Sequence, residues 1–179
     1  MVTHVIYSTT YGHTAGIAAK IAAALGTEAK LVADAPTAVG DDVVIALCPI
    51  YAGKLKDADT VLAHAGEAPS TKVIGVTVGT SSTTDSESLA GRERAASAAT
   101  PGVLRDRIRW FHVRGGIDFT KLSFAHRMIM GLIKGKIRKE AAAGSADAQA
   151  MIDAYGTTCT IDDSATIERI VAEARSLGA

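Results

Sequence analysis

The sequence predicts an α/β fold in which one doubly wound parallel sheet of five strands is covered by helices on both faces. Apolar runs rich in valine and isoleucine alternate with alanine-rich stretches of helical periodicity, which is the pattern of repeated βαβ units. The runs are continuously apolar, as expected for strands that are buried on both faces. The chain has 179 residues and is 47% hydrophobic, which suits one domain with a sizeable core.

The N-terminal elements are predicted from apolar spacing and a glycine stop. Ile17, Ile21 and Leu25 lie four residues apart, which places them on one stripe of a helix. Gly26 follows directly and is a common helix end. Residues 42–49 are apolar after the first position and belong at the centre of the sheet. The expected elements are strands at residues 4–7, 30–33 and 42–49 and a helix at residues 15–25.

The remaining elements follow from the same two patterns. Pro101 and Gly102 break the third helix, and Gly115 closes the fifth strand. A last helix begins after the polar residues 162–164, which can cap it. Its apolar positions recur at helical spacing and are Ile167, Ile170, Val171, Ala174 and Leu177. The other expected elements are helices at residues 57–65 and 89–99 and strands at residues 72–78 and 109–114.

Residues 117–160 exceed what this fold needs. A minimal five-stranded fold passes from the fifth strand directly to the last helix, so the surplus predicts an inserted functional segment within a single domain of residues 1–179. The insertion is expected to contain a helix with apolar and basic faces. Its apolar positions are Leu122, Phe124, Ala125, Met128, Ile129, Met130, Leu132 and Ile133, and its basic positions are Arg127, Lys134, Lys136, Arg138 and Lys139.

Charge is distributed unevenly along a chain with no net charge. Residues 105–139 contain ten Lys or Arg and two acids, a net charge of +8, and the other residues together carry −8. A basic segment on an acidic body attracts phosphates, anionic lipids or acidic ligands. Contact of residues 121–139 with a membrane surface is therefore one expectation. Packing of the same helix on its own domain or on a second chain is the alternative.

Composition excludes several classes of protein. The chain is too apolar and too low in net charge to be disordered or fibrous. The N-terminal residues lack the pattern of a secretory signal, and no window approaches the roughly 18 apolar residues of a membrane-spanning helix. We therefore expect a cytoplasmic protein, with attachment to the inner membrane face left open. Cys48 and Cys159 are too few for a zinc site or a disulfide framework, so we expect buried thiols, no metal and no nucleic-acid partner.

The segment between the first strand and the first helix carries the strongest ligand signal. Hydroxyl side chains and a glycine stand at the positive end of a helix dipole, where hydroxyls and backbone N–H groups can bind a phosphate without a lysine. The chain contains neither the Gly-x-Gly-x-x-Gly dinucleotide pattern at this turn nor the P-loop pattern. A helix cap without a ligand is the alternative. The candidate residues are Ser8, Thr9, Thr10, Tyr11, Gly12, His13 and Thr14.

The pattern Thr9-x-x-Gly12-x-Thr14 after the first strand resembles the phosphate loop of flavodoxins, in which Thr/Ser-x-Thr-Gly-x-Thr binds the phosphate of FMN. The resemblance implies FMN as the cofactor and a flavodoxin-like sheet of strand order 2-1-3-4-5. Tyr11 departs from the family pattern, which has a hydroxyl-bearing threonine there. One phosphate contact is therefore expected to be lost or to be made by the backbone.

Two further segments complete the flavin site that the resemblance implies. Tyr51 is the candidate that stacks on the isoalloxazine ring, because a rigid aromatic side chain offers a large flat surface at small entropic cost. A tyrosine packed over the sheet edge is the alternative. The loop after the fourth strand has no aromatic residue, so one flavin face is expected to be open to a substrate. The candidate residues are Pro49, Ile50, Tyr51, Ala52, Gly53, Gly79, Thr80 and Gly115.

The whole chain resembles the flavodoxin-like branch that contains menaquinone-dependent protoporphyrinogen oxidase. The likeness rests on residues 8–14, on residues 50–53 and on residues 119–130, which lead into a methionine-rich helix. It implies an FMN-dependent oxidoreductase of heme biosynthesis that passes electrons from a tetrapyrrole substrate to a quinone. A flavodoxin-type electron carrier and a non-catalytic binding protein of the same fold are the alternatives. No catalytic acid or base is assigned, because the flavin supplies most of the chemistry.

Overall fold

The computed structural model describes residues 1–66, 68–121, 124–144, 146–153 and 155–178. These residues fall into two compact units. The first contains Met1–Gly115 and Asp162–Ala179, and the second is the segment Gly116–Ile161. The second unit is therefore inserted into the chain of the first.

The first unit is built on a parallel sheet. Its strands are β1 (Thr3–Tyr7), β2 (Ala29–Leu31), β3 (Val43–Tyr51), β4 (Lys54–Leu55), β5 (Lys72–Gly79) and β6 (Ile108–Arg114). The order across the sheet is β2-β1-β3-β5-β6, with every neighbouring pair parallel. The short strand β4 pairs with β3 in the antiparallel sense. Among the parallel strands the order is 2-1-3-4-5, which confirms the predicted doubly wound fold.

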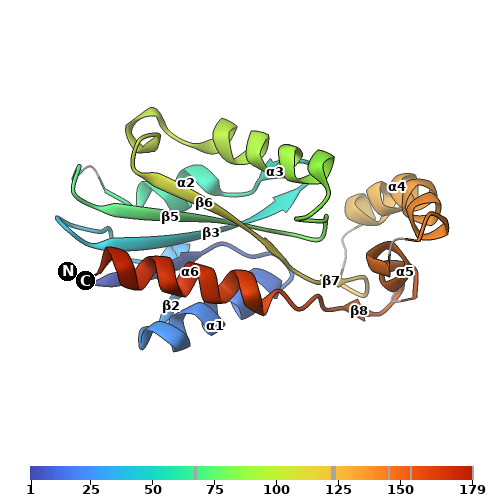
Figure 1. The fold of residues 1–179 in the computed structure, drawn as a ribbon, viewed down its shortest axis with the longest axis horizontal. Coiled ribbons are helices and arrows are strands. Elements are labelled where there is room, and N and C mark those ends of the chain that lie inside the picture. Colours follow the sequence, from blue (N-terminus) through green and yellow to red (C-terminus); the bar gives the residue numbers. More distant parts are fainter. Residues whose placement is uncertain (67, 122–123, 145, 154, 179) are drawn as a thin grey trace. The chain divides into compact units, whose positions relative to one another are not determined.

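Helices cover both faces of this sheet (Figure 1). They are α1 (His13–Leu25), α2 (Ala58–Ala63), α3 (Ser86–Ala99) and α6 (Ser164–Leu177), with short 3-10 helices at Val32–Asp34 and Gly102–Leu104. One core lies between the sheet and the pair α1 and α6, and the other lies on the face that α2 covers. Residues of β3 alternate between these cores, since Ile45 and Leu47 belong to the first and Val44 and Ala46 to the second. This two-sided burial explains the continuous apolar run.

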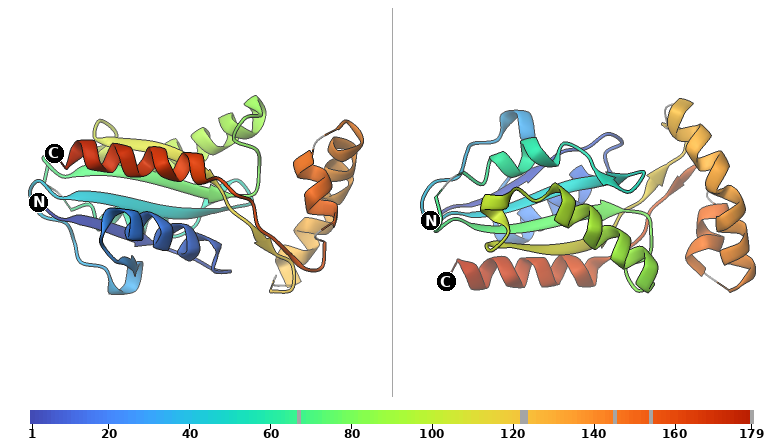
Figure 2. Two further views of the ribbon diagram at one scale, coloured as in Figure 1. Left: turned by 60° about the horizontal axis from the view of Figure 1, so that its bottom comes forward. Right: turned by 90° about the horizontal axis from the view of Figure 1, so that it is seen from above.

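The second unit contains β7 (Ile117–Asp118), α4 (Phe124–Ala142), α5 (Ala146–Asp153) and β8 (Thr158–Cys159). β7 and β8 form an antiparallel ribbon that begins and ends the inserted segment. The helices α4 and α5 pack against each other (Figure 2). The ammonium of Lys134 lies 4.3 Å from the centre of the Tyr155 ring. The centroid of the Phe119 ring lies 4.9 Å from the centroid of the Tyr155 ring.

The predicted amphipathic helix corresponds to α4, and only part of its surface is described. The exposed fraction is 82% for Leu132 and 57% for Met128, which are four residues apart. Two apolar side chains on this stripe therefore face away from the core of their unit. Leu122 lies outside the described residues, as do the side chains of Phe124, Ala125, Arg127, Ile129, Met130, Ile133 and Lys136.

Several boundaries differ from the expected ones. Helix α3 begins at Ser86 rather than at residue 89, because the carboxylate of Asp85 accepts a 2.8 Å hydrogen bond from the Ser88 N–H and caps the helix. Helix α1 begins two residues earlier than expected, and Gly26 ends it in the left-handed conformation. The edge strand stops at Leu31, where a 3-10 helix follows. Cys48 and Cys159 are both buried and unpaired, as expected.

Close packing between β5 and β6 depends on one glycine. Gly75 stands opposite Trp110 in the parallel register. A Cβ atom built on Gly75 would lie 2.5 Å from the indole ring of Trp110, which is shorter than any van der Waals contact. The indole N–H of Trp110 donates to the hydroxyl of Thr100 at 3.1 Å. The ring is therefore held against a position that only glycine can occupy without rearrangement.

Candidate functional site

The predicted site residues come from the carboxyl ends of four parallel strands. Residues 8–12 connect β1 to α1, residues 49–53 end β3, residues 79–80 end β5, and Gly115 follows β6. Parallel strands point the same way, so these segments meet at one edge of the sheet. β1 and β3 are neighbours, and the chain winds outward from them in opposite directions. The site therefore lies at the topological switch point, where doubly wound sheets bind ligands.

The first loop is shaped by its own hydrogen bonds. Gly12 has a φ of 90° and forms the N-cap of α1, with no side chain bonded as a cap. Its N–H donates to the hydroxyl of Thr9 at 3.0 Å. Ser8 is buried, and its N–H donates to the carbonyl of Leu47 at 3.1 Å. A Cβ atom at Gly12 would meet nothing within 4 Å, so the outer side of the loop is open above the helix N-terminus.

The second segment is a hairpin and not the loop that the sequence suggested. Pro49, Ile50 and Tyr51 continue β3, and β4 pairs back onto it, with Tyr51 opposite Lys54. The two connecting residues have positive φ, 48° at Ala52 and 75° at Gly53. Two such residues form the type I′ connection that suits the twist of a hairpin. The ring of Tyr51 is therefore carried on a paired strand.

The hairpin and the first loop are joined by aromatic and hydroxyl contacts. The rings of Tyr11 and Tyr51 lie edge to face, with centroids 6.0 Å apart and planes at 85°. The side chains of Tyr51 and Thr10 are hydrogen-bonded to each other. Burial raises the pKa of Tyr51, and the hydrogen bond with Thr10 opposes that shift. The Tyr51 phenol is therefore neutral at physiological pH and can act as a hydrogen-bond donor.

Lys56 provides a third contact between these segments, and no sequence pattern predicted it. Its ammonium donates to the hydroxyl of Thr10 at 3.0 Å. Its carbonyl accepts a 3.3 Å hydrogen bond from the hydroxyl of Ser8, and its N–H donates to the carbonyl of Pro49 at 2.9 Å. Lys56 follows β4 directly, so formation of the hairpin brings it back to the first loop. A sequence motif cannot predict a contact between residues this far apart in the chain.

Arg92 on α3 donates hydrogen bonds to the end of β5 and to the turn that follows it. Its side chain is only 2% exposed. The guanidinium donates to the carbonyls of Gly79 at 2.9 Å and Ser81 at 2.6 Å, and to the hydroxyl of Ser81 at 3.1 Å. It also donates to the carbonyl of Val113 on β6 at 3.1 Å. One buried cation therefore holds the end of β5 and the following turn.

The Arg92 guanidinium belongs to a buried polar chain. Its Nη1 lies 3.5 Å from the hydroxyl of Thr77, which is 2.9 Å from Nδ1 of His112. Burial lowers the pKa of Arg92 to about 10, and the charge of Arg114 adds to that effect. Burial also lowers the pKa of His112, with a further contribution from Arg92. His112 is therefore neutral at physiological pH.

Gly115 lies against the start of α1. Its N–H donates to the carbonyl of Gly79 at 2.8 Å. A Cβ atom at Gly115 would lie 2.8 Å from the Val78 side chain and 3.9 Å from Cβ of His13. The small size of this residue therefore lets the end of β6 approach the beginning of the helix. At the same edge, a Cβ atom on Gly79 would lie 3.5 Å from Cβ of Ile50.

The predicted residues are linked to one another through the hairpin. Residues 8–14 contact the hairpin through Thr10, Tyr11 and Ser8, and Gly79 lies between the hairpin and Gly115. Thr80 accepts a 3.3 Å hydrogen bond from Arg114 through its carbonyl. Arg92 could have been suspected from spacing, since it lies three and four residues before the buried Ala95 and Ala96. Arg94, which does not share this spacing, is exposed.

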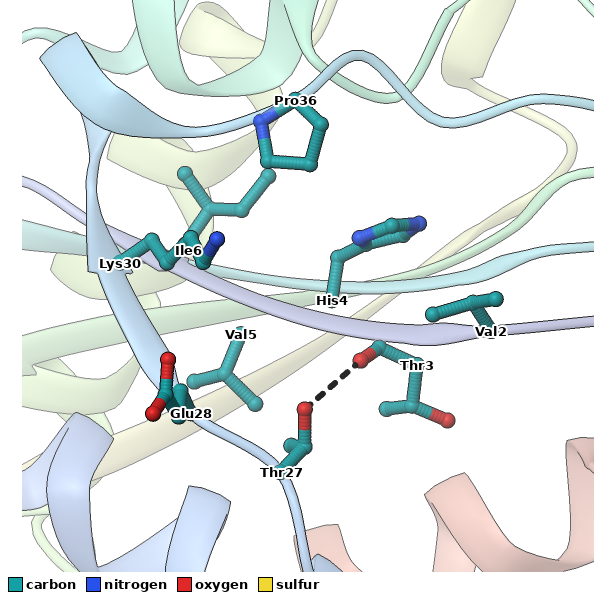
Figure 3. Close-up of a pocket in the computed structure, with 9 residues that line it drawn as sticks. All are labelled: Val2, Thr3, His4, Val5, Ile6, Thr27, Glu28, Lys30 and Pro36. Atoms are coloured by element: carbon teal, nitrogen blue, oxygen red, sulfur yellow. Dashed lines mark hydrogen bonds between the residues drawn. The ribbon is translucent and has the colours of Figure 1, made fainter.

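A pocket of about 360 Å³ lies elsewhere, along β1 and β2 (Figure 3). Nε2 of His4, which lines it, is 3.0 Å from the carboxylate of Asp42, and the Thr27 hydroxyl donates to the carbonyl of Thr3. These polar groups are therefore hydrogen-bonded to other groups of the protein. None of the predicted site residues lines this pocket. Its lining residues are Val2, Thr3, His4, Val5, Ile6, Thr27, Glu28, Lys30 and Pro36.

Among the described residues, no three His, Cys, Asp or Glu side chains gather as ligands for a metal ion. No helix formed by these residues is both long and apolar enough to cross a membrane.

The fold is that of a doubly wound α/β protein, and the candidate site at its switch point combines a hydroxyl-rich helix N-terminus with an aromatic hairpin. The sequence model of the flavodoxin domain matches residues 4–143. The chain therefore belongs to the flavodoxin domain family.

A solved structure titled as that of a "putative flavoprotein" from Bacteroides eggerthii is similar, with 14% sequence identity and a TM-score of 0.42. The similarity covers 74% of this chain and 96% of that one. No curated protein matches the sequence significantly.

Proposed function

We propose that the protein binds one FMN at the carboxyl edge of its sheet and uses it in an oxidation–reduction reaction. Membership of the flavodoxin domain family supports this proposal. The observation that carries it is the joining of the Thr9–Thr14 loop to the Tyr51 hairpin at the switch point, through the Tyr11–Tyr51 ring contact and the hydrogen bond between Thr10 and Tyr51. Phosphate-binding and ring-binding elements are thereby adjacent.

The residues present fit this cofactor. The open N-terminus of α1, which has no side-chain cap, offers its N–H groups and the helix dipole to a phosphate. The hydroxyls of Thr9, Thr10 and Thr14 lie in or beside the same turn. The Tyr51 side chain, half-buried on a paired strand, is a rigid surface for an aromatic ring. Bound FMN would supply the electron transfer, and these residues would hold and orient it.

The turn after β5, residues 79–85, suits a site in which one face of the flavin is accessible. The turn that follows β5 contains small and hydroxyl-bearing residues, and Arg92 and Arg114 hold its carbonyls. Residues 79–85 contain no aromatic side chain. A substrate could therefore approach a ring bound at Tyr51, which favours an enzyme over a carrier with an enclosed flavin.

The finer proposal follows from the resemblance to the protoporphyrinogen oxidase branch. We propose a quinone as electron acceptor and an amphipathic, tetrapyrrole-like molecule as donor. The insertion supports this choice, because α4 exposes Met128 and Leu132 and carries the exposed basic residues Arg138 and Lys139. Flexible thioether and aliphatic side chains suit irregular apolar molecules, and cations suit carboxylates.

The first experiment is a titration of the purified protein with FMN, followed by stepwise spectroelectrochemical reduction. Micromolar or tighter binding is expected, with reduction in one two-electron step. Two well-separated one-electron steps would support the electron carrier instead. Absence of binding at micromolar FMN would contradict both redox functions and leave the non-catalytic binding protein.

The second experiment tests turnover directly. The FMN-loaded protein is incubated under anaerobic conditions with protoporphyrinogen and a water-soluble menaquinone analogue, and porphyrin fluorescence is recorded. Turnover that requires the quinone is expected. A protein that binds FMN but shows no quinone-dependent turnover would retain the flavin assignment and lose the proposed donor and acceptor.

A further inference from the structure

We propose that Lys56 binds the phosphate group of FMN and makes the site selective for phosphorylated flavin over riboflavin. This inference rests on the proposed function and deepens it. Residues 8–14 contain no Lys or Arg, so the loop itself supplies only hydroxyls, N–H groups and the helix dipole. Lys56 brings a full positive charge to the same loop from a different segment.

The main chain of Lys56 is fixed at two points. Its N–H donates to the carbonyl of Pro49 at 2.9 Å, and its carbonyl accepts from the buried hydroxyl of Ser8 at 3.3 Å. One bond ties the residue to the end of β3, and the other ties it to the start of the phosphate loop. The Cα of Lys56 is therefore positioned by the hairpin before any ligand binds.

The side chain reaches the centre of the loop. Nζ donates to the hydroxyl of Thr10 at 3.0 Å. The carboxylate of Asp57 lies 3.7 Å from Nζ, and the two side chains are 44% and 41% exposed. An ammonium has three N–H donors. With one donor on Thr10 and one near Asp57, a third remains for an anion, and the Asp57 contact is too exposed to compete strongly with a phosphate dianion.

Thr10 and Lys56 act together in this arrangement. The Thr10 oxygen accepts from Lys56, and the Thr10 side chain is also hydrogen-bonded to Tyr51. Thr10 therefore anchors Nζ at the loop, and a remaining N–H of Lys56 is the donor offered to a phosphate. A phosphate placed at the open side of Gly12 would be within the same turn as this pair. A lysine binds phosphate as a strongly hydrated point charge. Removal of the charge should therefore weaken binding of FMN and leave binding of riboflavin, which has no phosphate, almost unchanged.

The test compares two ligands across four proteins. Dissociation constants for FMN and riboflavin are measured by fluorescence quenching for the wild-type protein, Lys56→Met, Lys56→Arg and the control Lys54→Met. Lys54 is an exposed lysine on the same hairpin, so the control removes an equal charge close by. Lys56→Met is expected to weaken FMN binding by roughly 10- to 100-fold, with riboflavin affected less than about twofold. Lys56→Arg should retain most of the preference for FMN, and Lys54→Met should retain all of it.

Salt dependence provides a second measurement. The FMN affinity of the wild-type protein should fall with added NaCl, and that dependence should be weaker in Lys56→Met, because screening acts on the removed charge. The riboflavin affinity should show little dependence in either protein.

Each contrary outcome has a distinct meaning. Equal losses for both ligands in Lys56→Met would show that Lys56 supports the hairpin only, and an unchanged FMN affinity would show that it has no role. An equal loss of FMN affinity in Lys54→Met would show that any nearby positive charge attracts the ligand and that Lys56 has no specific role. Each of these results overturns the inference and leaves FMN binding intact. A wild-type protein that binds neither ligand would contradict the proposed function itself.

Discussion

The rings of Tyr11 and Tyr51 meet edge to face, 6.0 Å between centroids and 85° between planes. Tyr11 occupies the position at which the flavodoxin pattern has a threonine. With tyrosine at this position, an aromatic pair joins the loop after β1 to the hairpin. Such pairs contribute about 0.5–1.5 kcal/mol beyond the burial of area. The loop is therefore held in place by a ring where related loops carry a hydroxyl.

Replacement of Tyr51 by leucine should weaken FMN binding about fivefold to tenfold, because the flavin would no longer stack on a flat aromatic ring. The flavin fluorescence of the complex should also be less quenched. Both are measured in one titration. Tyr155→Leu, an exposed tyrosine of the second unit, is the control and should leave the affinity unchanged. An unaltered affinity in Tyr51→Leu would support the alternative in which this ring only covers the sheet edge.

Arg92→Met should lower the free energy of unfolding by about 2–4 kcal/mol, because buried carbonyls of the β5 turn and of β6 lose their donor. Urea denaturation followed by circular dichroism measures the change. Arg94→Met on the same helix removes an exposed arginine and should change stability by less than about 0.5 kcal/mol. Similar stabilities for the two variants would mean that the guanidinium bonds of Arg92 contribute little.

Gly75→Ala should destabilise the protein by about 1–3 kcal/mol, because its Cβ would overlap the indole of Trp110. Trp110 is the only tryptophan of the chain, so a shift in its fluorescence reports the local rearrangement. Gly131→Ala on α4, where a Cβ would meet nothing within 4 Å, should be neutral or slightly stabilising. Unchanged fluorescence and stability in Gly75→Ala would contradict the described packing.

Acid should destabilise the protein partly through Asp42. Hydrogen bonds from His4 and from the N–H of Val39 lower the pKa of Asp42 from 3.8 to about 2, against the opposing effect of burial. A lowered pKa in the folded state means that the stabilisation is complete above about pH 4 and is lost as the pH falls toward 2. Asp42→Asn should therefore cost about 1–3 kcal/mol at pH 7.

The check is a series of urea denaturations between pH 2 and pH 7. The difference in stability between the wild-type protein and Asp42→Asn should shrink as the pH falls from 4 to 2. A difference that stays constant over this range would show that the carboxylate charge is not what stabilises the contact with His4.

Replacement of residues 116–161 by a short Gly-Ser linker should leave the first unit folded. The N–H of Arg114 donates to the carboxylate of Asp163 at 2.7 Å, so the two chain ends that flank the insertion are already adjacent. FMN affinity should stay within about threefold of the wild-type value, and quinone-dependent turnover should disappear. Retained turnover would contradict the proposed role of the insertion. Leu132→Glu in the chain of 179 residues tests the exposed apolar stripe without deletion.

The fold was predictable because its signals are local. The continuous apolar run of β3 and the four-residue spacing in α1 are properties of neighbouring residues. The hairpin was missed because Pro49 suggested the end of a strand, whereas β3 runs two residues further and β4 is only two residues long. The N-terminal turn of α3 was missed because Asp85 caps it before its first apolar residue.

The candidate site was predictable only in outline. Residues 8–14 and Tyr51 could be proposed as ligand-binding because the sequence places them at the ends of apolar runs, and their roles toward a ligand stay predictions. Lys56 and Arg92 act on loops that are distant in sequence, and their roles depend on non-local contacts that a single sequence does not encode in a recognisable pattern. The contact between Tyr11 and Tyr51 is of the same kind.

The position of α6 has a consequence for biosynthesis. Its residues Ile167, Ile170 and Val171 belong to the same core as Phe111 and Val113 of β6, yet they are translated only after the whole insertion. The nascent chain therefore carries β6 with part of its apolar surface uncovered while the second unit is being made. Exposed apolar surface of this kind promotes aggregation and chaperone capture. Translation speed across residues 116–161 should thus influence the yield of native protein.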